Sequence, residues 1–327
     1  APLHALFASA DAVVANYETA TGSVDAARER ALVYSVDPAW MDAVAGSGVT
    51  ALTLANNHAC DLGTAGLTAT IDAARGNVVG LGADREDPWK ARTVAEKNGR
   101  RVCVVAWTTF VNDAGSACER SDALALAPLG KRGTERAAQA IRNARASGCD
   151  VTIAIAHGGL EYEPQARPMR AQALAIAEAG ADAVVLHHPH VPSPIVVAET
   201  SDGRRVPIFE SIGNLVSNQG ESWTTAYPPM QADHRIVYLN GWTRAGIVAE
   251  VDIDVDGPKP ALTFGYHVVW TDNDHLADKS NKTPRIATRV LDPVADAAIT
   301  HQLGRDRKLG PLLASPCWME SSRSICR

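Results

Sequence analysis

Short apolar runs alternate with helical patterns along the first two thirds of the sequence. Residues 49–55 and 181–187 are apolar and contain β-branched residues, which is typical of buried parallel strands. Residues 66–75, 134–147 and 167–179 repeat apolar positions at helical spacing. Because helices between strands act as right-handed crossovers in a parallel sheet, this order predicts an α/β fold.

From Pro194 onward, apolar and polar residues alternate. The sequences Ser-Asp-Gly at 201–203 and Asp-Gly-Pro at 256–258 each separate two such runs, which indicates β-hairpins. We therefore expect one α/β domain over residues 1–272 that finishes in antiparallel strands. Residues 273–327 then form a C-terminal extension that packs on this domain or trails from it.

The sequence of 327 residues carries a formal net charge of -6, which provides no basic surface for nucleic acid. We therefore expect no nucleic-acid partner. No apolar run approaches the roughly 18 residues that a membrane span needs. No charged segment followed by an apolar one opens the chain either. The protein is thus either soluble or targeted by a segment outside this sequence.

Six cysteines leave the redox compartment open. Cys103 lies within a predicted strand and Cys149 just before one, so we expect two buried thiols. Cys317 and Cys326 bracket a polar tail and could close a small disulfide loop or stay free. Such bridges persist only in oxidising compartments. No Cys-x-x-Cys pair occurs, which argues against a thiolate zinc site.

Histidines follow three of the predicted strands. His58 comes after the first, His157 ends the second, and the third leads into His187, His188 and His190. Ligands of open α/β sheets bind at the carboxyl ends of the strands. We therefore expect these imidazoles to meet at one edge of one sheet.

Neutral imidazoles, amide oxygens and carboxylates suit a borderline divalent cation. The candidate ligands are Asn57, His157, His188, His190 and Glu18. His188 and His190 lie two apart, so on a strand they face the same side, as two ligands of one centre must. His187 then faces the other way, and we expect it either to be structural or to contact a ligand from outside the metal's own ligand set.

Several of these residues also have plainer interpretations. Asn57 could be a turn residue, and Glu18 could be an ordinary loop carboxylate. Asn56 could cap the following helix, and Asp61 could either cap it or orient His58. His58 is the candidate proton donor or acceptor beside the metal.

Taken together, the motifs resemble the CapA and PgsA capsule-synthesis family, which belongs to the calcineurin-like metallophosphatase superfamily. The resemblance covers roughly residues 3–272. The residues that carry it are Asn16-Tyr-Glu18, Ala55-Asn-Asn-His58 with Asp61 and Gly63, His157-Gly-Gly159 with Glu161-Tyr-Glu163, His187-His-Pro-His190 and Ser211-Ile-Gly-Asn214.

The resemblance implies a four-layered α/β/β/α sandwich of the metallophosphatase type. It implies one metal position shared by Asn57, His157 and His188, and a second served by His190. Glu18 would stand where phosphatases place a bridging aspartate, and His58 would be the catalytic histidine.

This sequence departs from the family pattern in three places. Family members open with a strand ending in Gly-Asp, so we expect that strand, its metal ligand and any membrane anchor to lie upstream of this sequence. His187 replaces the usual glycine, and Glu18 replaces an aspartate. We therefore expect one divalent cation rather than two, with Mn, Zn, Fe, Mg and Ca all open as its identity.

The resemblance implies a function in poly-γ-glutamate, capsule or peptide metabolism. It also implies peptide epimerisation by acid–base chemistry near the metal site, because some relatives are similar to peptide epimerases. His58 would then exchange protons together with Glu18, Asp61 or Glu161. The alternatives are a metal-dependent phosphoesterase and a non-catalytic scaffold of a capsule-polymer assembly. The expected partners are a peptide or poly-γ-glutamate substrate and membrane-bound capsule synthesis proteins. The resemblance implies an extracytoplasmic, membrane-associated location, with a cytoplasmic one left open.

Overall fold

The structure is a computed structural model with mixed α/β architecture. It describes residues 3–23, 25, 32–164, 167–226, 236–273, 286–313, 317–320 and 323–326. Residues 167, 317–320 and 323–326 are described by their backbone alone. The α/β class expected from the sequence is confirmed.

The larger sheet contains six strands in the order β10-β11-β9-β8-β7-β6. β7, β8, β9 and β11 run parallel, and the antiparallel strands β6 and β10 form its two edges. The turn at 201–203 joins β10 to β11, so this predicted hairpin is confirmed. The bounds are β6 (Arg92–Lys97), β7 (Arg100–Thr108), β8 (Val151–His157), β9 (Ala183–His187), β10 (Ile195–Glu199) and β11 (Arg205–Phe209).

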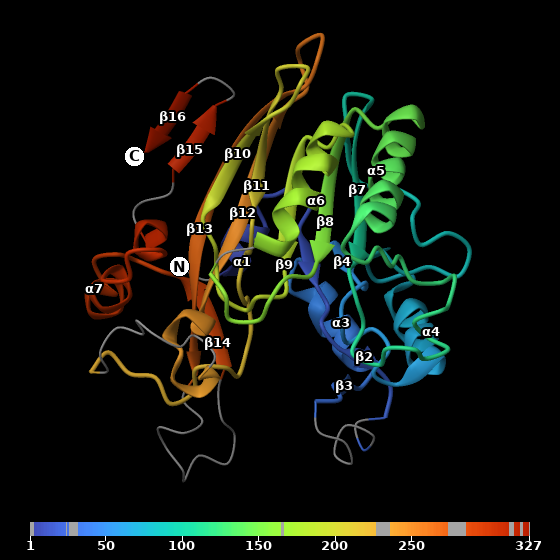
Figure 1. The fold of residues 1–327 in the computed structure, drawn as a ribbon. Helices are drawn as coiled ribbons and strands as arrows, with labels where there is room; N and C mark the ends of the chain where they lie inside the picture. Colours follow the sequence, from blue (N-terminus) through green and yellow to red (C-terminus); the bar gives the residue numbers. More distant parts are fainter. Residues whose placement is uncertain are drawn as a thin grey trace.

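Two helices, α5 (Lys131–Ala146) and α6 (Arg167–Glu178), cover one face of this sheet (Figure 1). Both overlap the helices predicted at 134–147 and 167–179. Their buried stripes are rich in alanine, and Ala138 of α5 and Ala173 of α6 belong to one core with Ala154 of β8. Small side chains at these positions allow helix and sheet to approach closely.

The opposite face of the six-stranded sheet packs against two further sheets. A three-stranded parallel sheet has the order β1-β4-β5, and a five-stranded antiparallel sheet is built around β13. Leu81, Ile155 and Ile247, one from each of the three sheets, share a single core. The bounds are β1 (Val14–Asn16), β4 (Ala51–Thr53), β5 (Val79–Leu81), β12 (Ala245–Asp254), β13 (Ala261–Asn273), β14 (Ile286–Val290), β15 (Cys317–Glu320) and β16 (Arg323–Cys326).

This arrangement corrects the expectation that the histidines share one sheet. His58 follows β4 of the three-stranded sheet, whereas His157 and His187 end strands of the six-stranded sheet. Strand patterns identify each strand but not its partners, because pairing depends on long-range contacts. The carboxyl ends of parallel strands from two sheets therefore meet, rather than those of one.

Short elements cover the outer side of the three-stranded sheet. α1 (Leu3–Phe7), α3 (Ala39–Gly46) and α4 (Gly63–Ala74) contribute Phe7, Met41 and Leu67 to one core there. β2 (Ala20–Thr21) and β3 (Ser35–Val36) form a small parallel pair next to α4. Two 3-10 turns, η1 (Val237–Leu239) and η2 (Gly241–Arg244), lead into β12.

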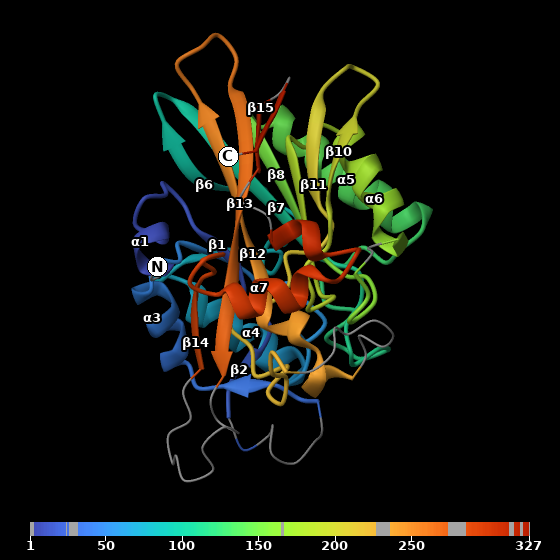
Figure 2. The ribbon, with the colours of Figure 1, turned by 90° about the vertical axis from the view of Figure 1, so that its left-hand side faces the viewer.

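Three described segments after residue 272 belong to the five-stranded sheet. β14 and β15 both pair with β13. Figure 2 shows α7 (Ala297–Gly304) in front of β12, and Leu303 of α7 shares a core with Ile247 and with Leu312 of η3 (Gly310–Leu313). The domain boundary at residue 272 stays a prediction. Within the described ranges, no helix combines the length and apolarity that crossing a membrane requires.

The expectation of buried thiols at Cys103 and Cys149 is wrong, because these residues form a disulfide beside β7 and β8. A second disulfide joins Cys60 to Cys118, and no described cysteine is free. A buried half-cystine gives the same apolar pattern as a buried thiol, so periodicity could not separate them. Cys317 and Cys326 stand opposite each other in the β15–β16 register, but their side chains lie outside the described residues.

Candidate functional site

Loops that follow four parallel strands converge where the sheets meet. Glu18 follows β1, Asn57 and His58 follow β4, His157 ends β8, and His188 and His190 follow β9. Each strand is held in register by its neighbours, so the positions of these loops are set by the sheets rather than by local sequence. The convergence brings together five predicted ligands from distant parts of the chain.

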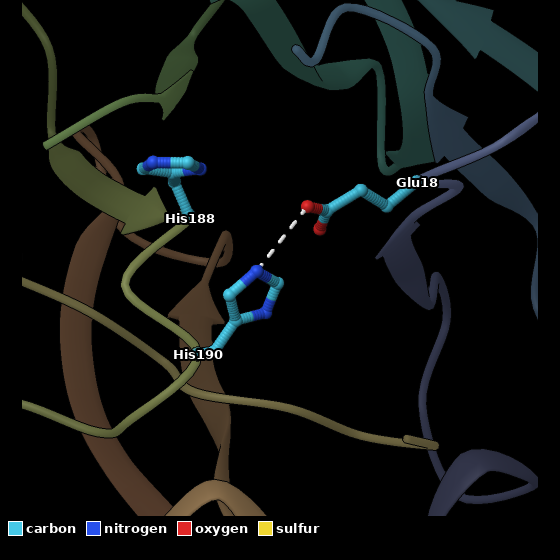
Figure 3. A group of neighbouring side chains, drawn as sticks. All are labelled: Glu18, His188 and His190. Atoms are coloured by element: carbon cyan, nitrogen blue, oxygen red, sulfur yellow. Dashed lines mark ion pairs between the residues drawn. The ribbon is translucent and has the colours of Figure 1, made fainter. Parts of the chain in front are cut away.

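Glu18, His188 and His190 form a group whose ligand atoms all lie within 4.8 Å of one another (Figure 3). Glu18 Oε1 lies 3.7 Å from His190 Nε2 and 3.7 Å from His157 Nε2. A carboxylate oxygen placed between imidazoles from two loops is a suitable arrangement for a divalent cation. The structure therefore contains a possible metal-binding cluster.

Asn57 and His157 extend this cluster. Asn57 Oδ1 lies 2.8 Å from His157 Nε2, which lies 3.1 Å from His188 Nδ1. A cation bound by nitrogen and oxygen at about 2.1 Å holds neighbouring ligands about 3 Å apart. In addition, Glu18 Oε1 is buried and has no hydrogen-bond partner among the described residues. An orphaned carboxylate oxygen at ligand spacing from imidazole and amide donors fits a cation.

Burial shifts the pKa values of the cluster. Burial is the largest effect and raises the pKa of Glu18 to about 7. Among the smaller effects, the charge of His190 lowers this pKa, the charge of Glu161 raises it, and the hydrogen bond from Asn16 lowers it. Burial is also the main cause that holds the pKa of His157 well below its usual value and lowers the pKa of His188 to about 3. These imidazoles are therefore neutral, which is the form that binds metals.

His188 and His190 do not converge by strand alternation, and the reason expected from the sequence is wrong. β9 ends at His187, and the backbone of His188 and His190 has φ values of 122° and 60°. Non-glycine residues seldom adopt these values, and such strain is retained mainly at functional sites. His188 packs edge-on against Phe110, and His190 Nδ1 lies 2.9 Å from Asn214 Oδ1.

His58 and Asp61 form a buried pair beside the cluster. His58 Nδ1 lies 2.7 Å from Asp61 Oδ2, which also accepts a hydrogen bond from the backbone N–H of Tyr34 at 2.7 Å. The Tyr34 ring stacks on the His58 ring at 4.1 Å. Of the two interpretations of Asp61, the structure therefore has the one in which it orients His58.

The interpretation of Asn56 as a helix cap is wrong. The residue at the N-cap of α4 is Leu62, and no side chain caps this helix. Asn56 instead accepts a hydrogen bond from the backbone N–H of His58 at 3.0 Å and donates to the carbonyl of Tyr17 at 2.8 Å. Asn56 thus links the loop carrying Glu18 to the loop carrying His58.

Glu161 is exposed, and its influence on the site is electrostatic. The neighbouring Tyr162 stacks on His190 with ring centroids 5.8 Å apart. Burial, followed by the charges of Glu161, Tyr34 and Glu18, raises the pKa of Tyr162 to about 12. Its phenol therefore stays protonated and remains a hydrogen-bond donor at neutral pH.

His187 does not face away from the site as expected. Its Nδ1 lies 2.6 Å from Nδ1 of His157, and the two residues are direct partners in the β8–β9 register. The alternation argument failed because it carried the strand on through His190, whereas β9 ends at His187. With His188 outside the strand, His187 takes the inward-facing position opposite His157.

Sequence reasoning missed three residues that contact the site: Tyr34, Phe110 and Asn112. Asn112 accepts a hydrogen bond from Asn57 Nδ2 at 3.2 Å, and its backbone N–H donates to the carbonyl of Asn57 at 2.9 Å. Phe110 and Asn112 lie in the segment between β7 and α5, which the Cys60–Cys118 disulfide ties to the His58 loop. For Phe110 and Asn112 the available signal was the unusual length of this segment, and no pattern pointed to Tyr34.

The chain has detectable relatives. It is 31% identical over 228 residues to the capsule biosynthesis protein CapA of Bacillus anthracis, covering 68% of this chain and 52% of that protein. It is 32% identical over 179 residues to the PGA biosynthesis protein CapA of Bacillus subtilis, covering 54% of this chain and 44% of that protein. The chain therefore spans about half the length of the curated relatives it matches.

The family described as bacterial capsule synthesis protein PGA_cap matches residues 1–219. This range contains all the converging residues described above, from Glu18 to Asn214. The resemblance inferred from the motifs is therefore confirmed, and the chain belongs to the PGA_cap family of bacterial capsule synthesis proteins.

Proposed function

We propose that this chain is a metal-dependent enzyme of capsule-polymer or peptide metabolism that epimerises an α-carbon by acid–base chemistry. The observation that carries the proposal is the placement of the His58–Asp61 pair beside the group of Glu18, His188 and His190. Epimerisation needs a group that moves a proton and a group that stabilises the enolate oxygen. This site offers a candidate for each task.

His58 is the proposed proton carrier. Its Nδ1 contacts Asp61, so its Nε2, which lies 3.5 Å from Asn112 Nδ2, is the nitrogen that would exchange a proton with a substrate. The carboxylate of Asp61 fixes the ring and stabilises it when it carries a second proton. The stacked Tyr34 ring keeps His58 buried, with 5% of its surface exposed, which limits proton exchange with bulk water.

The cation would be held by Asn57, His157, His188, His190 and Glu18. When bound, it supplies a positive charge that polarises a substrate carbonyl. The protonated phenol of Tyr162, stacked on His190, is a candidate donor to the same substrate. Removal of a proton from one face also requires delivery to the other, for which Glu18 and Glu161 are the candidate carboxylates.

The four-layered metallophosphatase sandwich belongs to this proposal. It is supported by helices α5 and α6 on one face of the six-stranded sheet (Figure 1), by the core that this sheet shares with the two other sheets, and by α3 and α4, which pack on the three-stranded sheet. An extracytoplasmic location is also proposed, and the two disulfides support it because such bonds persist in oxidising compartments.

The proposed substrate is poly-γ-glutamate or another peptide, and membrane-bound capsule synthesis proteins are proposed partners. The test incubates the cation-loaded protein in D₂O with a γ-linked glutamate oligomer and follows deuterium at the α-carbon by mass spectrometry. The proposal expects incorporation that His58→Gln abolishes. Incorporation that is unchanged in His58→Gln would contradict it.

A second candidate is metal-dependent phosphoester hydrolysis. It is favoured by the position of Glu18 Oε1, which lies 3.7 Å from His157 Nε2 and 3.7 Å from His190 Nε2, so that Glu18 could bridge two cations. Two bound equivalents, together with release of phosphate from a generic phosphoester, would support this candidate. If neither activity is found and His58→Ala leaves polymer production unaffected, the result would instead support a non-catalytic scaffold.

A further inference from the structure

His157 and His187 stand opposite each other in the parallel pairing of β8 and β9. Their Nδ1 atoms lie 2.6 Å apart, and their rings meet edge to face at 4.7 Å. Both side chains are buried, with 0% and 4% of their surface exposed. Nε2 of His187 has no hydrogen-bond partner among the described residues. The polar contact that the structure gives to His187 is therefore the one with His157.

A hydrogen bond between two Nδ1 atoms holds one proton, and each neutral imidazole carries one proton. Two arrangements fit the contact. In one, His187 donates, and the proton of His157 lies on Nε2, facing Asn57 Oδ1 at 2.8 Å. In the other, His157 donates from Nδ1, and its Nε2 presents a lone pair to Asn57, His188 and Glu18.

Only the second arrangement allows His157 to bind a cation, because a ligating nitrogen must offer its lone pair. Metal-binding histidines almost always donate their other ring N–H to a neighbouring acceptor, which fixes the tautomer and the ring orientation. We propose that His187 is the positioning residue that accepts this N–H, so that His157 presents Nε2 as a ligand. This inference rests on the cation site of the proposed function and assigns a task to a residue outside the cluster.

An imidazole suits this place for an electrostatic reason. The acceptor more often found behind a metal-binding histidine is a carboxylate or a carbonyl. A carboxylate here would bury a second negative charge near Glu18, which is already difficult to ionise. A neutral imidazole orients His157 without adding charge, and its place in β9 fixes it opposite His157.

The first test measures the dissociation constant of Zn²⁺ by competition with a chromophoric chelator. His187→Leu removes the acceptor and is expected to weaken binding about 10- to 100-fold. His187→Asn retains an acceptor oxygen at the position of Nδ1 and is expected to bind nearly as tightly as the wild type. The matched control is His267→Leu, whose histidine bonds Glu250 on the neighbouring strand β12, and it is expected to cause no change.

The second test needs no variant. ¹⁵N NMR of the histidine-labelled, Zn²⁺-loaded wild type is expected to show His157 protonated at Nδ1 and bound through Nε2. A wild type that binds no Zn²⁺ would overturn the cation site and this role together. Tight wild-type binding with an equal affinity in folded His187→Leu, or a proton on Nε2 of His157, would overturn the role of His187 alone.

Discussion

The site contains two buried pairs, each with a histidine, and they differ in the partner that holds the histidine ring. His58 is held by the carboxylate of Asp61 at 2.7 Å, and His157 by the imidazole of His187 at 2.6 Å. A carboxylate stabilises an imidazole that takes up a proton, whereas a second imidazole adds no negative charge. The first pair is suited to moving protons, and the second to remaining neutral and binding a cation.

The surroundings of the two pairs agree with this division. Burial and the neighbouring histidines keep the pKa of His157 low, and burial lowers that of His187 to about 3. His58 is buried to a similar degree, with 5% of its surface exposed against 4% for His187, but its partner is a carboxylate. The difference teaches that the partner of a histidine, rather than its burial, indicates its task.

The largest effect is expected from removing His188 and His190, the two imidazoles of the metal-binding cluster. In a His188→Ala/His190→Ala variant the bound cation should be lost, because two imidazoles of the group disappear. Deuterium incorporation should fall below detection with it. Elemental analysis of the purified protein measures the cation, and a variant that keeps its full cation content would break the proposed division of tasks.

Removing the proton carrier of the first pair should separate chemistry from cation binding. His58→Gln is expected to lower deuterium incorporation by about 10²- to 10⁴-fold, the usual contribution of a positioned acid–base group. Its cation content should equal that of the wild type. Asp61→Asn should give a smaller loss of the same kind, and loss of the cation from either variant would contradict the comparison.

The two disulfides allow the same chemical change, loss of a disulfide, to be compared near the site and away from it. Cys60→Ser/Cys118→Ser and Cys103→Ser/Cys149→Ser should each lower the free energy of unfolding by about 2–4 kcal/mol, as measured by urea titration. Only the first pair should also lower deuterium incorporation by the folded protein, because it frees the segment that carries Phe110 and Asn112. Equal activity in both folded variants would show that activity does not require the Cys60–Cys118 disulfide to hold this segment in place.

The smallest effect is expected from the ring above His58. Tyr34→Leu removes the aromatic contact at 4.1 Å and is expected to lower deuterium incorporation about 2- to 10-fold. Trp40→Leu, on the exposed side of α3, serves as the control and should leave the rate unchanged. An equal rate in Tyr34→Leu would indicate that Asp61 alone positions His58.

Local patterns in the sequence were sufficient to predict the class of the fold and the candidate ligands that gather at the site. Continuous apolar runs identified the strands that end near Asn57, His157 and His187, because each strand carries its own signal. The assembly of these strands into two sheets depends on contacts between residues far apart in the sequence. For the same reason the Cys103–Cys149 disulfide and the contacts of Tyr34 and Asn112 could not be predicted.

The task of His187 shows a different limit. The β8–β9 register places it opposite His157, and β9 ends there, whereas the alternation argument carried the strand on to His190. Strand boundaries are the least certain part of any pattern, and this one turned an inward-facing side chain into an outward-facing one. The left-handed backbone at His188 and His190 restores the convergence that strand alternation had been expected to provide.

The most direct test of the account measures two quantities on one sample: cation content and deuterium incorporation into a γ-linked glutamate oligomer by His58→Gln. The account predicts a full complement of cation with incorporation lost, because the His58–Asp61 pair moves the proton and the other histidines hold the cation. Incorporation at the wild-type rate, or loss of the cation, would contradict it.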